Sequence, residues 1–338
     1  MNNKIATLCL LLSTSLLLSG CDQLQQAFID RQVKKVNQNN FFEDVGDGIK
    51  VVLCGTGTPQ IRSSRGQACT LVAAGGKLFM FDAGENALRN IETNGVPLPA
   101  VSRVFITHWH SDHFNGLGGL INHTWVNGRS EPFIVYGPRG TDRVVKGLAM
   151  AYRMDVDFRN QHFVANPERA FAEARTISLA SDQNSTRVYD EGGVTIDAHR
   201  VNHYPVDPAF GYVLRYQGKK IFISGDTRVT DLYLEAIQDA DLVIHEAINS
   251  AMIHRAADAM RRQGRDKQAE HAVNVIKYHS DTLELADLAE KAGVKHLVLT
   301  HLIPSPPNFI AKRLFLSGMS DHFKGQITLG EDAMEIRL

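Results

Sequence analysis

The chain has almost no net charge and very few cysteines. Its 36 Lys and Arg are balanced by 37 Asp and Glu among 338 residues, so there is no global electrostatic attraction toward nucleic acid. Only Cys54 and Cys69 lie beyond the N-terminal segment, and their spacing excludes a zinc ribbon. With 43% hydrophobic and 22% charged residues, the composition is that of an ordinary globular protein, and the length allows one large domain or two modest ones.

The N-terminal segment has the pattern of a bacterial export signal. Lys4 supplies a positive charge, and residues 5–18 form an apolar stretch that is too short to span a bilayer comfortably. Leu18-Ser19-Gly20-Cys21 resembles the lipobox of bacterial lipoproteins, in which the cysteine is lipidated, and an aspartate in the position of Asp22 favours retention at the inner membrane. We therefore expect a lipoprotein signal peptide over 1–20, a lipid anchor on Cys21, and a location on the periplasmic side of the inner membrane. An ordinary secretory signal and an uncleaved anchor are the alternatives.

Residues 21–48 are polar and rich in Gln and Asn, with weak helical periodicity. They predict a polar tether that is partly helical, followed by one globular domain over 49–338. In an oxidising periplasm Cys54 and Cys69 could form a disulfide, although two buried thiols fit the sequence equally well.

Apolar runs of strand length alternate with helical patterns through the domain. Strands are expected at 50–54, 70–74, 78–81, 103–107, 133–136, 187–189, 194–201, 212–216, 221–224, 242–244 and 297–300. Helices are expected at 86–93, 114–122, 141–152, 232–238, 253–278 and 283–292. Residues 154–185 have poor periodicity and predict an irregular excursion. Because the strands form two groups, each followed by helices and without a linker between them, we expect a single α/β domain with two sheets and outer helices.

The segment Thr107 to His113 has the pattern H-x-H-x-D-H and directly follows the apolar run 104–106. Three imidazoles and a carboxylate occupy six consecutive positions, at His108, His110, Asp112 and His113. These are the ligands that Zn²⁺ and similar metal ions prefer. A single surface histidine is usually solvated, but this cluster predicts a metal site.

Other histidines and acids lie just past the ends of apolar strands. They are His203, Asp226, the pair His245 and Glu246, and His301. Strand ends at one edge of a sheet converge in space, so these side chains could surround the first cluster.

At this point the chain resembles the metallo-β-lactamase superfamily, and within it the branch shared by ribonuclease Z and the arylsulfatase-like hydrolases. Six motifs occur in the order seen there: Gly55-Thr56-Gly57-Thr58-Pro59, Asp82-Ala83-Gly84, the H-x-H-x-D-H run, Ser224-Gly225-Asp226-Thr227, His245-Glu246-Ala247 and Thr300-His301. The resemblance covers nearly all of 49–338 and implies an αβ/βα sandwich of two mixed sheets.

The resemblance also implies two divalent metal ions. The first would be held by His108, His110 and His203, the second by Asp112, His113 and His301, and both by the bridging Asp226. Two ions about 3.5–4 Å apart can share a hydroxide and make it a nucleophile near neutral pH. The ligands suit Zn²⁺ first, with Mn²⁺ and Fe²⁺ as alternatives.

Further residues have roles around the ions in the related enzymes. Asp112 would orient the nucleophile or accept its proton, and His245 would protonate the leaving oxygen with Glu246 orienting its ring. A hydrogen bond outside the site is the alternative for His245. His279 would lie near the site or order its backbone, and Asp82 would hold a ligand histidine by its free ring nitrogen.

The substrate is less narrowly defined. Bridging by Asp226 argues against a β-lactamase, and only 22 residues separate His203 from Asp226, where ribonuclease Z carries its tRNA-clamping arm. Together with the export signal, this favours a small or medium phosphodiester or sulfate ester over nucleic acid. The alternatives are a ribonuclease Z-like endoribonuclease, a lactonase or other acyl hydrolase, and a non-hydrolytic di-iron or binding module. A homodimer is compatible with all of them.

Overall fold

The computed structural model describes residues 22, 24–31, 41–42, 45–60, 64–162 and 166–338. The chain divides into two units, residues 1–44 and 45–338. In the first unit residues 24–31 are helical, with Leu24, Phe28 and Ile29 exposed. The predicted signal peptide and Cys21 lie outside the described residues. Among the residues that are described, no helix is both long and apolar enough to cross a bilayer.

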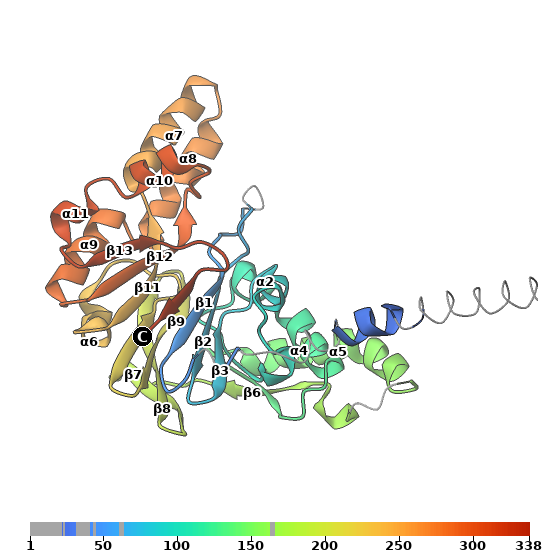
Figure 1. Ribbon diagram of the computed structural model, residues 1–338. Coiled ribbons are helices and arrows are strands. Elements are labelled where there is room, and N and C mark those ends of the chain that lie inside the picture. Colours follow the sequence, from blue (N-terminus) through green and yellow to red (C-terminus); the bar gives the residue numbers. More distant parts are fainter. Residues whose placement is uncertain (1–21, 23, 32–40, 43–44, 61–63, 163–165) are drawn as a thin grey trace, which may run out of the picture. The chain divides into compact units, whose positions relative to one another are not determined.

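Two seven-stranded sheets form the second unit (Figure 1). The first sheet contains, in spatial order, β14 (Glu335–Arg337), β1 (Lys50–Gly55), β2 (Cys69–Ala74), β3 (Lys77–Phe81), β4 (Arg103–Phe105), β5 (Phe133–Gly137) and β6 (Ala172–Thr176). The second contains β13 (Gln326–Leu329), β12 (His296–Ile303), β11 (Leu242–Ile248), β10 (Lys219–Ile223), β9 (Val206–Tyr216), β8 (Val194–His203) and β7 (Ser185–Glu191). Strands β3 to β6 and β10 to β13 pair in parallel, and all other neighbours pair antiparallel.

Helices cover the outer faces of the sheets. The α-helices are α2 (Ala87–Thr93), α3 (Ser111–Phe114), α4 (Leu117–Val126), α5 (Thr141–Arg159), α6 (Leu234–Ile237), α7 (Ser250–Arg262), α8 (Asp266–Val275), α9 (Thr282–Lys291), α10 (Phe309–Phe315) and α11 (Met319–His322). Short 3₁₀ turns lie at Leu98–Ala100, Pro167–Arg169, Asp231–Tyr233 and Ile276–Tyr278. In Figure 1 α4 and α5 lie beside the first sheet, and α6, α9 and α11 lie beside the second.

The main core lies between the two sheets. Phe81 and Phe105 of the first sheet stack with ring centroids 5.3 Å apart, and Tyr212 of the second sheet lies 5.5 Å from Phe81. Successive side chains of a strand point to opposite faces, so the alternate residues of the second sheet, such as Val213 and Val243, pack against the outer helices. The expected αβ/βα sandwich is confirmed.

One local expectation is wrong, and another gains detail. Residues 154–185 contain ordered elements, because α5 continues to Arg159 and β6 adds a parallel edge strand to β5. The sequence of β6, Ala-Glu-Ala-Arg-Thr, has no apolar run, since the strand is largely exposed. Residues 253–278, expected to be mostly helical, are so, as two helices, α7 and α8, which reverse direction at Gly264 with φ of 71°.

Cys54 and Cys69 form a disulfide, which resolves the choice that the sequence left open. Strands β1 and β2 are neighbours, and the pairing of Gly55 with Cys69 brings the two cysteines side by side. The bridge closes the excursion between them, where Asp332 accepts hydrogen bonds from the backbone N–H groups of Thr56 at 3.0 Å and Gly66 at 2.5 Å. This excursion is therefore tied down at both ends.

Candidate metal centre

The histidine motif lies at the carboxyl end of β4, in the first sheet. The strand ends at Phe105, His108 and His110 lie in the following loop, and α3 begins at Ser111. The segment that contains Gly84 packs closely against the start of α3. A Cβ added to Gly84 would come within 2.3 Å of the Asp112 carbonyl oxygen, so only glycine allows this approach.

The second sheet supplies the other candidate ligands from its strand ends. His203 ends β8, Asp226 follows β10, and His301 lies in β12. Gly225 has a φ of 60°, and a Cβ there would lie 2.6 Å from the Cβ of Thr107. The loops of the two sheets therefore meet at Gly225 and Thr107, which brings both sets of ligands together.

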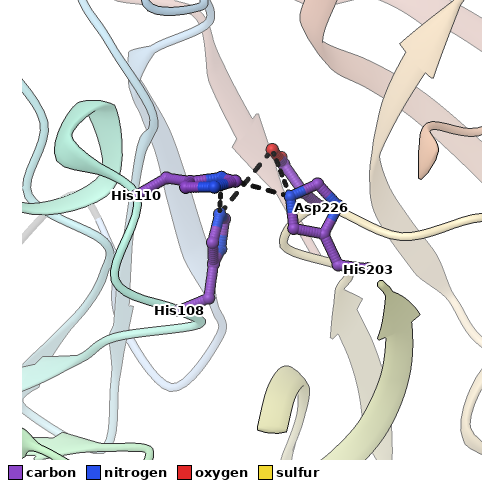
Figure 2. A group of neighbouring side chains, drawn as sticks. All are labelled: His108, His110, His203 and Asp226. Carbon is purple, nitrogen blue, oxygen red and sulfur yellow. Dashed lines mark hydrogen bonds and ion pairs between the residues drawn. The ribbon is translucent and has the colours of Figure 1, made fainter. Parts of the chain in front are cut away.

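The first group contains His108, His110, His203 and Asp226, which point toward one another in Figure 2. His110 Nδ1 lies 3.0 Å from His108 Nε2 and 3.2 Å from His203 Nε2. Asp226 Oδ2 lies 3.9 and 3.8 Å from the same two Nε2 atoms. His110 is exposed whereas the other three are buried, so the group is open to solvent on the His110 side.

The second group contains Asp112, His113 and His301, all buried. Asp112 Oδ2 lies 3.1 Å from His301 Nε2 and 3.7 Å from His113 Nε2. Asp226 Oδ2 also faces this group, at 3.4 Å from His113 Nε2 and 3.6 Å from His301 Nε2. The structure thus brings all seven expected ligands together, with Asp226 between the two groups.

The spacing of these atoms fits metal binding. Ligand atoms about 2.0–2.1 Å from a common tetrahedral ion stand roughly 3.4 Å from one another. His113 Nε2 and Asp226 Oδ1 are buried and form no hydrogen bond within the described part of the chain. Buried polar atoms are normally satisfied, and a metal ion is the partner that a ring nitrogen and a carboxylate oxygen can share.

Hydrogen bonds orient the ligand rings from behind. Asp82 Oδ2 lies 2.7 Å from His113 Nδ1, and Asp82 Oδ1 accepts from the backbone N–H of Thr107 at 2.8 Å. The carbonyl oxygen of Tyr278 lies 3.0 Å from His203 Nδ1. Such contacts fix the ring orientation and leave Nε2 free for a metal ion. Burial lowers the pKa of His203 to about 4, so the ring is a neutral ligand at physiological pH.

Glu246 and His279 form a buried pair beside the ligands. Glu246 Oε1 lies 3.0 Å from His279 Nδ1 and accepts 3.1 Å hydrogen bonds from two backbone N–H groups, of Thr227 and Ser280. The ring of His279 lies 5.5 Å from that of His301. Burial alone would lower the pKa of His279, but the Glu246 carboxylate overrides it and raises this pKa to about 9. The pair therefore holds a proton next to the cluster.

His245 is not brought to the cluster. It is completely buried, with Nε2 3.1 Å from the Tyr233 hydroxyl and Nδ1 2.8 Å from the Glu246 carbonyl oxygen. Neighbouring residues of a strand point to opposite faces, so β11 cannot direct both Glu246 and His245 at the metal ligands. The geometry matches the alternative of a buried hydrogen bond and does not place His245 where a proton donor is needed.

Two contacts to the ligands escaped the sequence analysis. The Tyr278 carbonyl is a backbone group and leaves no trace in the sequence. Thr107, whose hydroxyl lies 3.1 Å from His108 Nδ1 and donates to Asp82 at 2.9 Å, opens the histidine motif and could have been recognised by its position. Trp109 has its ring 5.4 Å from that of Phe114 and lies against Gly137, so it packs beside the motif.

A family model of the metallo-beta-lactamase superfamily matches residues 64–291. The chain belongs to this superfamily. It is 30% identical over 296 residues to a protein named Ribonuclease Z from Mycobacterium sp. (strain KMS), covering 86% of this chain and 96% of that one. The superfamily and these relatives make the chain a metallo-beta-lactamase-fold hydrolase with ribonuclease Z homologues.

Solved structures share the fold. Human tRNase Z, short form, superposes with a TM-score of 0.61 at 24% identity, covering 85% of this chain and 98% of that one. Zn²⁺-bound PqqB from Methylobacterium extorquens has a TM-score of 0.58 at 17% identity, covering 86% of this chain and all of that one. Both likenesses concern the fold, and they agree with the two-sheet arrangement described above.

The hydrogen bond from Asp82 to His113 gives a prediction about metal affinity. Asp82→Asn leaves every candidate ligand in place but weakens the hold on the His113 ring. We expect its affinity for zinc to fall about 10- to 100-fold, measured by competition with a chromophoric chelator. The matched control is Asp155→Asn, whose carboxylate accepts from Asn122 and Arg159 and contacts no ligand. Equal affinities for the two variants would contradict the prediction.

Proposed function

We propose that the protein is a two-metal phosphodiesterase that cleaves RNA. The observation that carries the proposal is the position of Asp226 Oδ2, which lies 3.4–3.9 Å from the Nε2 atoms of four histidines in two groups. One carboxylate oxygen between two sets of ligands supports a pair of ions that share it.

The residues would divide between the ions as the resemblance implies. The first would be held by His108, His110 and His203, the second by Asp112, His113 and His301, and Asp226 would contribute to both. Two divalent ions in such a site neutralise charge on the phosphoryl oxygens and lower the pKa of a water molecule to near neutrality. Zn²⁺ is the preferred ion for these nitrogen and oxygen ligands, with Mn²⁺ or Fe²⁺ as alternatives.

The chain's own acids and bases move the protons. Asp112, which lies beside His301 and His113, would accept the proton that the attacking water loses. His279 is held by Glu246 through Nδ1, which leaves Nε2 to donate a proton to the leaving oxygen as the P–O bond breaks. We therefore propose His279, with Glu246 as its positioning partner, for the role that the sequence analysis gave to His245.

The relatives favour the ribonuclease Z alternative over the small ester that the sequence analysis placed first. They are named as ribonucleases, and the match extends over 86% of this chain. An RNA phosphodiester is the bond that this name implies, whereas a sulfate ester has no comparable support. The short connection between His203 and Asp226 lacks room for a tRNA-clamping arm. This affects how a substrate is bound and leaves the residues proposed for phosphodiester hydrolysis unchanged.

The metal and the reaction are tested together. Purified protein is expected to carry close to two equivalents of transition metal and to hydrolyse RNA and bis(p-nitrophenyl) phosphate, with an aryl sulfate and a lactone as comparison substrates. His110→Ala is expected to lose metal and activity, measured by elemental analysis and by initial rates. His123→Ala, which removes an exposed histidine from α4, is the matched control and should resemble the wild type. Metal-free wild-type protein, or full activity in His110→Ala, would refute the proposal.

The proton donor is tested by the nature of the leaving group. A ribose oxygen needs a proton as it leaves, whereas p-nitrophenolate needs almost none. His279→Ala is therefore expected to lower kcat on RNA about 10²- to 10⁴-fold and to change kcat on bis(p-nitrophenyl) phosphate far less.

His245→Gln is the matched variant for this test, because it alters a buried histidine of the same region. It is expected to affect the two substrates equally, through stability alone. If His245→Gln, and not His279→Ala, loses much more activity on RNA than on bis(p-nitrophenyl) phosphate, then His245 is the proton donor and the role proposed for His279 is wrong.

We also propose the membrane location that the N-terminal sequence favours, with a lipid on Cys21 and the domain on the periplasmic side. The Cys54–Cys69 disulfide supports this, because structural disulfides persist in oxidising compartments. Labelling of cells with a palmitate analogue is expected to mark the protein, and Cys21→Ser is expected to abolish the label. Retention of label in Cys21→Ser would exclude the anchor.

A further inference from the structure

A helical hairpin interrupts the chain between the two members of the proton-holding pair. It consists of α7 and α8, and it leaves β11 just after Glu246 and returns just before His279. Its two ends are joined at the stem, where the backbone N–H of Ile248 donates to the Ser280 carbonyl at 2.8 Å. Figure 1 shows the two helices projecting beyond the sheets. The hairpin is thus anchored at the metal centre and directed away from it.

The hairpin contributes little to the core. Within α7 and α8 only Ile253, Ala257 and Ala269 are buried. Helices α7 and α8 pack against each other, and Met252 also contacts the core beside the second sheet. Residues 261–268 at the far end are all exposed, so the core of the sandwich does not explain this part of the hairpin.

The hairpin concentrates positive charge in a chain whose net charge is −1. Residues 250–278 contain six Lys and Arg against three Asp and Glu, a formal net charge of +3. Four of these cations lie in the exposed segment at the tip, namely Arg261, Arg262, Arg265 and Lys267. Arg261 pairs with Asp258 at 2.9 Å, whereas the other three have no carboxylate within 4.0 Å among the described residues.

The stem is coupled directly to the ligands. Tyr278, the last residue before His279, holds the ring of His203 through its carbonyl oxygen at 3.0 Å. A 13-residue helix is about 20 Å long, so the cations at the tip stand roughly that far from the stem. A molecule that touched both the tip and the metal ions would have to be an extended chain with negative charges along its length.

We propose that the α7–α8 hairpin is the docking arm for the phosphate backbone of the RNA strand, a surface separate from the metal centre. This rests on the proposed phosphodiesterase function. Lys and Arg bind phosphates by charge, with little dependence on sequence. An anionic membrane is disfavoured as the partner, because helices that lie in membranes expose large apolar side chains and residues 250–278 expose none.

The test compares two triple variants that remove the same charge. Arg262→Ala/Arg265→Ala/Lys267→Ala neutralises the tip, and Lys291→Ala/Lys295→Ala/Lys324→Ala neutralises three exposed lysines near the start of β12, at the opposite end from His301. The probe is a fluorescein-labelled phosphorothioate RNA, which is cleaved slowly, and binding is followed by anisotropy over a range of salt concentrations. Hydrolysis of bis(p-nitrophenyl) phosphate, which is too small to reach the tip, reports on the integrity of the centre.

The tip variant is expected to bind RNA at least about tenfold more weakly than the wild type. The slope of log K against log salt concentration should become smaller in magnitude by about 2, because three cations are removed and each phosphate contact to a single strand contributes about 0.7 to the slope. Its rate on the small diester should remain within about twofold of the wild type. The control variant should match the wild type in all three measurements.

Several outcomes would overturn the docking arm. The first is unchanged RNA binding in the tip variant, and the second is an equally large loss of RNA binding in both variants. The third is a tip variant that loses binding to phosphatidylglycerol vesicles but still binds RNA, which would make lipid the partner of the hairpin. If the wild type binds RNA through the tip but hydrolyses neither substrate, the proposed function fails and the docking arm stands.

Discussion

The structure depends on one buried carboxylate that lies among imidazoles. Asp226 is 3% exposed, and four ring nitrogens face its Oδ2. An ionised carboxylate that is removed from water costs on the order of several kcal/mol unless a positive charge compensates it. Imidazoles this close together cannot all be protonated, because their charges would repel one another. A divalent metal ion held by ligands from both sheets would meet the requirement, and the packing of the two sheets is what brings those ligands together.

Much of this site could be predicted from the sequence, because strand ends obey a simple rule. A polar residue directly after a buried strand must emerge at the edge of the sheet, and the ends of neighbouring parallel strands emerge at the same edge. His203, Asp226 and His301 all have this context, and the structure brings them to the H-x-H-x-D-H motif. The two-sheet fold could be predicted from the same pattern, because a strand buried on both faces appears in the sequence as a short apolar run, and these runs form two groups.

What the sequence missed or left open has equally specific causes. Glu246 and His245 are adjacent in a strand, so only one can face the metal ligands, and the motif alone did not say which. The edge strand β6 is largely exposed and has no apolar run. Neither the hydrophobic periodicity nor the hydrophobicity of its sequence therefore indicates a strand. The Cys54–Cys69 bridge depends on the pairing of β1 with β2, which no local pattern specifies. Each of these points concerns the direction or partner of an element, and those are set by tertiary packing.

In the proposed function the position of the hairpin separates recognition from chemistry. Its tip is about 20 Å from the stem, too far to stabilise charge at the reacting phosphorus. RNA contacts made there would be equal in the ground state and the transition state, so they would lower KM without raising kcat. His279, held by Glu246 near the stem, would donate the proton at the reacting ester. The hairpin carries a net charge of +3 in a chain whose total is −1, so the remaining residues carry −4. In this proposal the arm attracts a polyanion that the rest of the chain repels.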